Sequence, residues 1–186
     1  MFVDKVRLQL SAGNGGNGVI AWRREKYIPK GGPCGGDGGK GGSIYIETDN
    51  QVVSLENYRN RRIIVAQNGQ PGGPNLRTGK NGKDLTLKIP PGTLVKDATT
   101  GEVLYDFIEK DRQEILCKGG KGGKGNNRFK TSTNQAPYIC TEGEPGETRE
   151  IELELKLIAD VGLIGMPNAG KSSLMSCITH LQVKIG

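Results

Sequence analysis

The residues best suited to chemistry form a short loop near the end of the chain, from Gly165 to Ser173. The loop follows the pattern G-x-x-x-x-G-K-S, in which glycines let backbone N–H groups curl around phosphates. The lysine of this pattern adds positive charge, and the serine hydroxyl is placed to bind Mg²⁺. The predicted nucleotide-binding residues are Gly165, Met166, Pro167, Asn168, Ala169, Gly170, Lys171, Ser172 and Ser173, and Ser172 is also the predicted metal ligand.

The sequence on both sides of this loop predicts the strand and the helix that a phosphate loop needs. Leu157–Ile164 is almost continuously apolar, as expected for a strand that is buried on both faces of a parallel sheet. After the loop, Leu174, Ile178 and Leu181 recur at helical spacing, and a helix N-terminus adds to anion binding. The sequence therefore predicts a phosphate site between a strand and a helix.

Hydrolysis needs further groups that do not follow the loop. Phosphoryl transfer requires an acid on a second strand to hold Mg²⁺ and a residue that positions the attacking water. Neither a DxxG nor an NKxD motif occurs between Ser172 and Gly186. We therefore expect this chain to be truncated within its second domain, to carry no catalytic residue, and to bind nucleotide weakly when alone.

The first part of the chain is organised around glycine. The stretch Trp22–Gly42 ends in repeated Gly-Gly-X triplets, and related runs occur at Gly13–Gly18, Gly69–Gly82 and Gly119–Gly125. A period of three residues matches polyproline II, in which glycine along one edge lets neighbouring backbones approach closely. A flexible linker is the alternative. Because the runs lack serine, carry many charges and are bounded by strand-like segments, we favour ordered arrays.

Strand patterns surround the glycine runs, so the chain is predicted to be mainly β until its character changes near residues 157–160. A hairpin is expected where the turn-rich DATTG separates Thr93–Lys96 from Glu102–Tyr105, and Arg149–Lys156 alternates strictly between apolar and charged residues. The change of character near residues 157–160 predicts a first domain of residues 1–158 and a second of residues 159–186. The other expected strands are Val6–Leu10, Ser43–Glu47, Ile63–Ala66, Leu85–Ile89 and Glu114–Cys117, with a weak helical turn near Val52–Tyr58.

The charge of the chain favours a polyanionic partner. The net charge is +6 and the sequence pI about 9.2, with basic residues concentrated on the glycine runs and acidic residues in Glu142–Glu154. The lysines could simply keep exposed loops soluble, the glutamates could form a solvated strand face or repel RNA, and Trp22 could be a core aromatic or stack on a base. The predicted RNA-contacting residues are Lys26, Lys30, Lys40, Arg77, Lys80, Lys83, Lys121, Lys124 and Arg128.

The cysteines show neither paired nor metal-like spacing, and the single histidine, His180, could not complete a zinc site. Reduced thiols in a cytoplasmic protein are therefore expected. The N-terminus does not resemble a signal peptide, and no apolar run approaches the roughly 20 residues of a membrane helix. We expect a monomer without a membrane span.

The order of these motifs resembles the Obg-type ribosome-assembly GTPases over essentially the whole chain. Trp22 and Met166 stand where phenylalanine is common in that family. The resemblance rests on FVDKVRLQL, AGNGGNG, RREKYIPKGGPCGGDGGKGG, RTGKNGKDL, IPPGTLVKDATTGEVL, KGGKGGKGN, TNQAPY, GEPGE and LELKLIADVGLIGMPNAGKSS.

The resemblance implies a glycine-rich Obg domain, built as a β-barrel with polyproline-II segments, followed by a truncated α/β P-loop GTPase domain. It also implies that the complete protein binds GTP and GDP, hydrolyses GTP with Mg²⁺, and contacts RNA of the large ribosomal subunit during late assembly. In this family the loops enter the peptidyl-transferase region, and GTP gates binding. Two other functions stay open: an RNA-binding module that acts without nucleotide, and a collagen-like trimer, which the short triplet runs disfavour.

Overall fold

The computed structural model describes residues 3–25, 28–108, 112–156, 164–166, 170, 171 and 174, without the side chains of residues 24, 25 and 28–30. The chain divides into two compact units, residues 1–156 and 157–186. The predicted strand Leu157–Ile164 and the helix after the loop lie almost wholly outside the described residues. The elements of the first unit are β1 (Lys5–Ser11), β2 (Trp22–Glu25), β3 (Ile28–Pro33), β4 (Ile44–Thr48), η1 (Glu56–Tyr58), β5 (Ile63–Val65), β6 (Leu85–Ile89), β7 (Thr93–Asp97), β8 (Val103–Phe107), β9 (Gln113–Cys117), η2 (Asn126–Phe129) and β10 (Thr148–Leu155).

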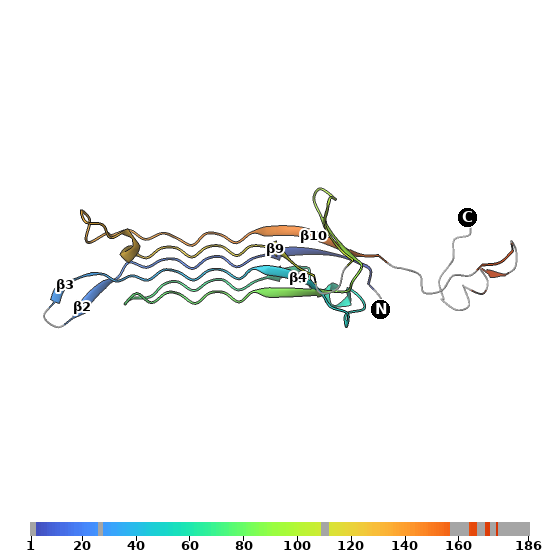
Figure 1. Ribbon diagram of the computed structural model, residues 1–186, viewed down its shortest axis with the longest axis horizontal. Helices are drawn as coiled ribbons and strands as arrows, with labels where there is room; N and C mark the ends of the chain where they lie inside the picture. Colours follow the sequence, from blue (N-terminus) through green and yellow to red (C-terminus); the bar gives the residue numbers. More distant parts are fainter. Residues whose placement is uncertain are drawn as a thin grey trace. The chain divides into compact units, whose positions relative to one another are not determined.

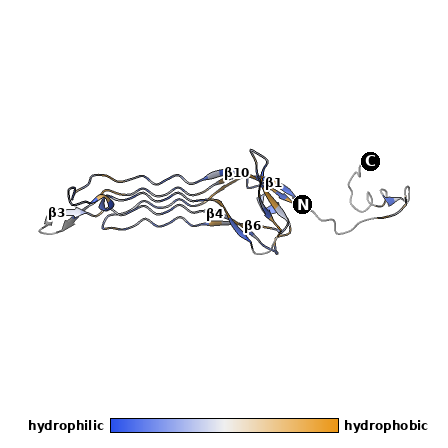
Figure 2. Cartoon of the chain, turned by 45° about the horizontal axis from the view of Figure 1, so that its top comes forward, coloured by the Kyte–Doolittle hydropathy of each residue, from blue (hydrophilic) through white to orange (hydrophobic). Residues whose placement is uncertain are grey.

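Two sheets enclose the hydrophobic core of the first unit. One has the strand order β5-β1-β10-β7-β8 and the other β6-β4-β9. Alternate residues of β1 point inward, and Leu10 belongs to the same fully buried core as Ile44, Phe107 and Ile151. Figure 2 shows hydrophobic residues gathered on strands such as β1 and β4, whereas the extended segments beyond them are mostly hydrophilic or neutral.

These sheets confirm the mainly β class that the sequence predicted. Each expected strand of the first unit is present within one or two residues of its expected ends, and β7 pairs antiparallel with β8 as the predicted hairpin. The weak helical turn is present as the short η1. Closure of the sheets into a barrel is not shown by this pairing and stays an expectation. In the part of the chain that the structure describes, no helix has the length and apolar character to cross a membrane.

A hairpin that the sequence did not predict lies within the Trp22–Gly42 stretch. β2 pairs antiparallel with β3, and Trp22 is opposite Pro33. The Trp22 ring is partly exposed and lies 5.6 Å from the ring of Tyr138, at an interplanar angle of 33°. The interpretation of Trp22 as a core aromatic is therefore wrong, because Trp22 is partly exposed and does not belong to the buried core.

Six extended segments run side by side away from the sheets (Figure 1). We number them in chain order: segment 1 (residues 12–19), segment 2 (34–42), segment 3 (66–73), segment 4 (76–83), segment 5 (118–126) and segment 6 (141–147). They contain almost no helix or strand pairing, yet their backbones are hydrogen-bonded to one another. Gly125 has φ −73° and ψ 164°, close to polyproline II.

The bonds between segments recur every three residues. Between segments 1 and 2, Gly16 donates to the carbonyl of Gly39 at 2.8 Å, and Gly13 donates to that of Gly42 at 2.9 Å. Segment 1 is also bonded to segments 3, 5 and 6, and segment 2 to segments 3, 4 and 5. Segments 1 and 2 are therefore innermost, with segments 3 and 4 on one side and segments 5 and 6 on the other, as the green and yellow-to-orange traces in Figure 1 show.

Glycine is required in this bundle because the backbones nearly touch. A Cβ on Gly38 would lie 1.8 Å from the carbonyl oxygen of Gly16, and a Cβ on Gly122 would lie 2.0 Å from that of Gly38. Real Cβ atoms do not approach oxygen so closely, and the contacts are with backbone that cannot rotate away. The ordered-array interpretation is confirmed, and the flexible-linker alternative is wrong.

Glu152 corrects the expectation that Glu142–Glu154 forms a solvated strand face. It lies opposite Arg7 in the β1–β10 pairing and is only 8% exposed. Its two carboxylate oxygens accept from Lys5 Nζ and Arg7 Nε, each at 2.9 Å. Hydrogen bonds from Lys5 and Arg7 lower the pKa of Glu152 below its ordinary value.

Substitution of the packed glycines tests the bundle. Gly38→Ala and Gly122→Ala should each lower the free energy of unfolding by about 1–3 kcal/mol or more, because the added methyl group collides with backbone. Thermal unfolding measures the effect. Gly32→Ala is the control, since a Cβ there meets nothing within 4 Å, and its midpoint should stay unchanged or rise. Equal midpoints for all three variants would contradict this packing.

The Glu152 ion pairs should make stability depend on acid pH. Because the folded-state pKa is lowered, the stabilisation is complete above the unfolded pKa of about 4.5 and is lost as pH falls through the folded value. Glu152→Gln should therefore reduce stability at pH 7, on the order of 1 kcal/mol, and flatten the acid limb of a denaturation series. The exposed neighbour Glu150 is the control, and Glu150→Gln should keep the wild-type pH profile. An unchanged profile in Glu152→Gln would contradict the role of these pairs.

Candidate phosphate loop and nucleic-acid interface

The described part of the phosphate loop comprises residues 164–166, 170, 171 and 174. Lys171 Nζ donates to the carbonyl oxygens of Gly165 and Met166, each at 2.6 Å. Gly170 has φ +75°, a conformation that favours glycine, and its carbonyl accepts from Leu174 N–H at 2.9 Å as in the first turn of a helix. The lysine thus holds the start of the loop close to the residues that begin the helix.

These residues fit phosphate binding. The left-handed turn at Gly170 explains the second glycine of the motif, and the Lys171 ammonium places a positive charge against the first residues of the loop. Pro167, Asn168, Ala169, Ser172 and Ser173 lie outside the described residues, so their predicted contacts with phosphate and Mg²⁺ stay predictions. Among the residues with described placement, no cluster of three metal-ligating side chains occurs.

The predicted RNA-contacting cations that the structure describes are all exposed, but they do not form one patch. Arg77, Lys80 and Lys83 follow one another along segment 4, and Lys40 lies on the adjoining segment 2, where its N–H donates to Asn81 Oδ1 at 2.8 Å. The others belong to segment 5 and η2: Lys121, Lys124 and Arg128. Lys26 and the side chain of Lys30 lie outside the described residues.

The structure corrects the expected separation of basic and acidic charge. Residues 142–147 form segment 6, which lies directly beside segment 5: Glu144 N–H donates to the Lys121 carbonyl at 2.8 Å. The two side chains also approach each other, with Lys121 Nζ 3.7 Å from Glu144 Oε2. Arg128 Nε donates to Asp37 Oδ2 at 2.8 Å. Lys121 and Arg128, which have no acid near them in the sequence, are therefore paired with acids in space.

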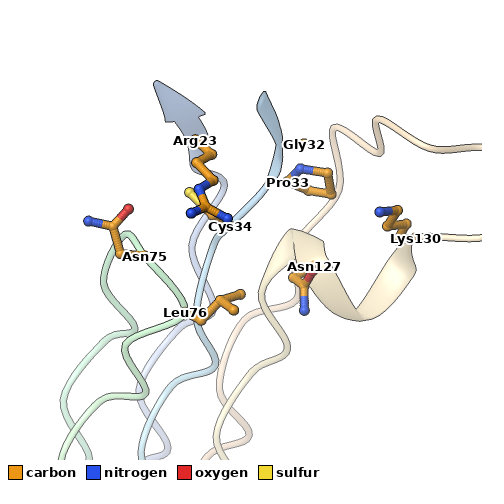
Figure 3. Close-up of a pocket in the computed structure, with 8 residues that line it drawn as sticks. All are labelled: Arg23, Gly32, Pro33, Cys34, Asn75, Leu76, Asn127 and Lys130. Carbon is orange, nitrogen blue, oxygen red and sulfur yellow. The ribbon is translucent and has the colours of Figure 1, made fainter. Parts of the chain in front are cut away.

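A pocket of about 620 Å³ lies at the end of the bundle away from the sheets (Figure 3). It forms where the β2–β3 hairpin, the turn before segment 4 and η2 meet. Asn75 and Leu76 have φ +56° and +60°, which non-glycine residues rarely adopt. The sequence did not predict this pocket because its residues come from three distant stretches: Arg23, Gly32, Pro33, Cys34, Asn75, Leu76, Asn127 and Lys130.

Asn126 fixes the elements around this pocket. Its side chain is fully buried, and its Oδ1 accepts from the N–H of Gly35 at 2.8 Å. Its Nδ2 donates to the carbonyls of Ala21 and Pro137 at 3.2 and 3.4 Å. The amide thus joins segments 2 and 5 to the chain before β2 and after η2. The only feature of the sequence that could have indicated this role is the pair of asparagines directly after a glycine run.

Two comparisons place the chain among known proteins. The GTP1/OBG family model matches residues 3–157. The chain is 63% identical over 185 residues to GTPase Obg of Protochlamydia amoebophila, 55% identical over 184 residues to that of Persephonella marina, and 50% identical over 186 residues to that of Staphylococcus aureus. These alignments cover 99–100% of this chain and 55%, 54% and 43% of the respective relatives.

These matches confirm the resemblance to the Obg-type GTPases that the motifs indicated. The chain belongs to the GTP1/OBG family. It spans about half the length of the curated relatives that it matches.

Loss of the Asn126 amide should loosen the end of the bundle. Asn126→Ala leaves the buried N–H of Gly35 without its acceptor, at a cost of about 1–3 kcal/mol. Hydrogen exchange at the Gly35 amide should accelerate while that of the core strands stays slow. The neighbouring Asn127 is exposed, so Asn127→Ala is a matched control that should leave this amide protected. Equal protection in both variants would contradict the role of Asn126.

Proposed function

We propose that this chain is the RNA-contacting first domain, residues 1–158, with the start of the GTPase domain, residues 159–186, of a cytoplasmic protein that binds the large ribosomal subunit during late assembly. The observation that carries the proposal is the bundle of six hydrogen-bonded glycine segments, whose flanks carry exposed lysines and arginines. Glycine leaves the bundle little side-chain bulk. Such an arm is suited to enter a cavity in folded RNA while its cations meet phosphates.

The phosphate loop supports nucleotide binding in the complete protein. Lys171 and the backbone of residues 165–173 would hold the phosphates of GTP or GDP, and Ser172 would hold Mg²⁺. Bound Mg²⁺ neutralises the charge that develops on the phosphates during transfer. The residues of this chain bind and orient the phosphates, and the groups that read the base and position water are expected beyond them.

A second candidate function is RNA binding without nucleotide. It is favoured by the first unit, which has its own buried core and its own hydrogen-bonded bundle. The two functions differ in whether nucleotide changes the affinity for ribosomal subunits.

Nucleotide titration tests the GTPase assignment. The 186-residue chain should bind a fluorescent GTP analogue with Mg²⁺ more weakly than micromolar, because no base-reading motif follows the loop. In the protein extended through its catalytic domain, Lys171→Ala should abolish nucleotide binding. Lys124→Ala, at an exposed lysine outside the loop, is the control and should leave nucleotide binding unchanged. GTP hydrolysis retained in Lys171→Ala would contradict the role of the loop.

Co-sedimentation tests the ribosomal partner. The chain should pellet with purified large subunits and much less with small subunits, and its affinity should fall steeply as salt rises. Equal binding to both subunits, or none to either, would contradict the proposed partner. A change of affinity with GTP in the extended protein, but not in the isolated chain, would favour the GTPase over the nucleotide-independent module.

A further inference from the structure

We propose that the bundle meets RNA phosphates through one flank only: the exposed edge of segment 4, formed by Arg77, Lys80 and Lys83. The flank formed by segments 5 and 6 does not take part. This inference rests on the proposed function and names the surface that performs it.

The three cations of segment 4 form one row. Polyproline II has three residues per turn, so side chains at i, i+3 and i+6 lie on the same edge, about 9 Å apart. The backbone of segment 4 faces inward: Lys80 O accepts from Gln70 N–H at 2.9 Å, and Gly79 N–H donates to Asp37 O at 2.8 Å. The side chains of the row are therefore directed outward, and all three residues are exposed.

The row is also free of acidic partners. Within the described ranges, no carboxylate lies at ion-pair distance from any of its three cations. The two acids that adjoin segment 4 are engaged elsewhere. Asp84 Oδ1 accepts from Ser43 N–H at 2.7 Å, and Asp37 binds both the Gly125 N–H and Arg128.

The opposite flank has the same number of cations but no net charge. Segment 5 carries its own row at three-residue spacing, comprising Lys118, Lys121 and Lys124. Segment 6 places three glutamates beside this row: Glu142, Glu144 and Glu147. Glu144 approaches Lys121, and Glu147 Oε2 accepts from the Lys118 N–H at 2.9 Å. A phosphate that approached this flank would meet as much negative as positive charge, so electrostatic attraction there is weak.

The chemistry of the segment 4 flank fits RNA better than an acidic protein. Segment 3, its neighbour, presents Gln67 and Gln70, and the positions of segment 4 between the cations are glycine, threonine and asparagine. Protein interfaces depend on buried aromatic and apolar anchors, which this flank does not offer between residues 77 and 83. Evenly spaced cations among small polar residues are suited to a phosphate backbone.

Two matched triple variants of the 186-residue chain test the proposal. The first is Arg77→Gln, Lys80→Gln and Lys83→Gln, and the second is Lys118→Gln, Lys121→Gln and Lys124→Gln. Binding to large ribosomal subunits is measured across a salt series. Each lost phosphate contact should reduce the slope of log K against log salt by about 0.7–0.9, so the first variant should lose roughly 2–3. The second should lose less than about 0.5, although it removes the same charge.

A third variant tests whether the glutamates of segment 6 keep phosphates away from the segment 5 lysines. This variant combines Glu142→Gln, Glu144→Gln and Glu147→Gln, so it removes the negative charge beside these lysines without removing any cation. Because these glutamates are what weakens the attraction of this flank for phosphates, their loss should let the segment 5 lysines meet RNA and steepen the slope by about 0.7–0.9 for each new phosphate contact. A slope equal to that of wild type would overturn the argument from charge, since the lysines would then stay away from RNA without the glutamates.

The remaining outcomes separate this inference from the proposed function. If the segment 5 variant loses as much slope as the segment 4 variant, the one-sided surface is wrong although RNA binding stands. If wild type does not bind large subunits, the proposed function itself fails. Tighter wild-type binding to polyglutamate than to ribosomal RNA would overturn RNA as the occupant.

Thermal unfolding shows whether each triple variant is folded, and single Lys80→Gln and Lys121→Gln variants repeat the comparison with the smallest change.

Discussion

The first unit depends on hydrogen bonds between backbones that any side chain would hold apart. Gly16 shows the constraint: its N–H bonds to Gly39 at 2.8 Å, and a Cβ on it would lie 2.0 Å from the carbonyl of Gln70. A backbone hydrogen bond to a neighbouring segment and too little space for a Cβ recur together every third residue along segments 1 and 2. Each of these two segments contacts four other segments. Because direct N–H···O bonds replace a hydrophobic core here, the bundle can extend beyond the sheets with little apolar residue content.

The same constraint decides where side chains can lie. A residue that is not glycine must point away from the inner segments, so the residue types at every third position determine the character of each flank. On segment 4 this rule aligns Arg77, Lys80 and Lys83, and on segments 5 and 6 it aligns lysines beside glutamates. The proposed RNA contact therefore lies on an outer edge, and at the far end Asn126 ties several segments together.

Much of the fold could be predicted from the sequence, because alternation and triplet period are local signals. Alternation in β1 and β10 and the Gly-Gly-X runs identified both the strands and the ordered segments. What could not be predicted depends on which segments become neighbours. The sequence predicted that Glu152 is solvated because its partners Lys5 and Arg7 are far from it along the chain. It likewise gave no sign that segment 6 places glutamates beside the lysines of segment 5. The terminal pocket joins three distant stretches, and no local pattern encodes it.

Amide hydrogen exchange along segment 4 tests the central claim most directly. Gly79 and Gly82 donate to carbonyls of segment 2 at 2.8 and 2.7 Å, whereas the Thr78 and Asn81 amides donate to no group in the described part of the chain. The account predicts slow exchange at Gly79 and Gly82 and fast exchange at Thr78 and Asn81, a three-residue rhythm without helix or sheet. Uniformly fast exchange across these four amides would contradict it, because the glycine segments would then be an unbonded linker.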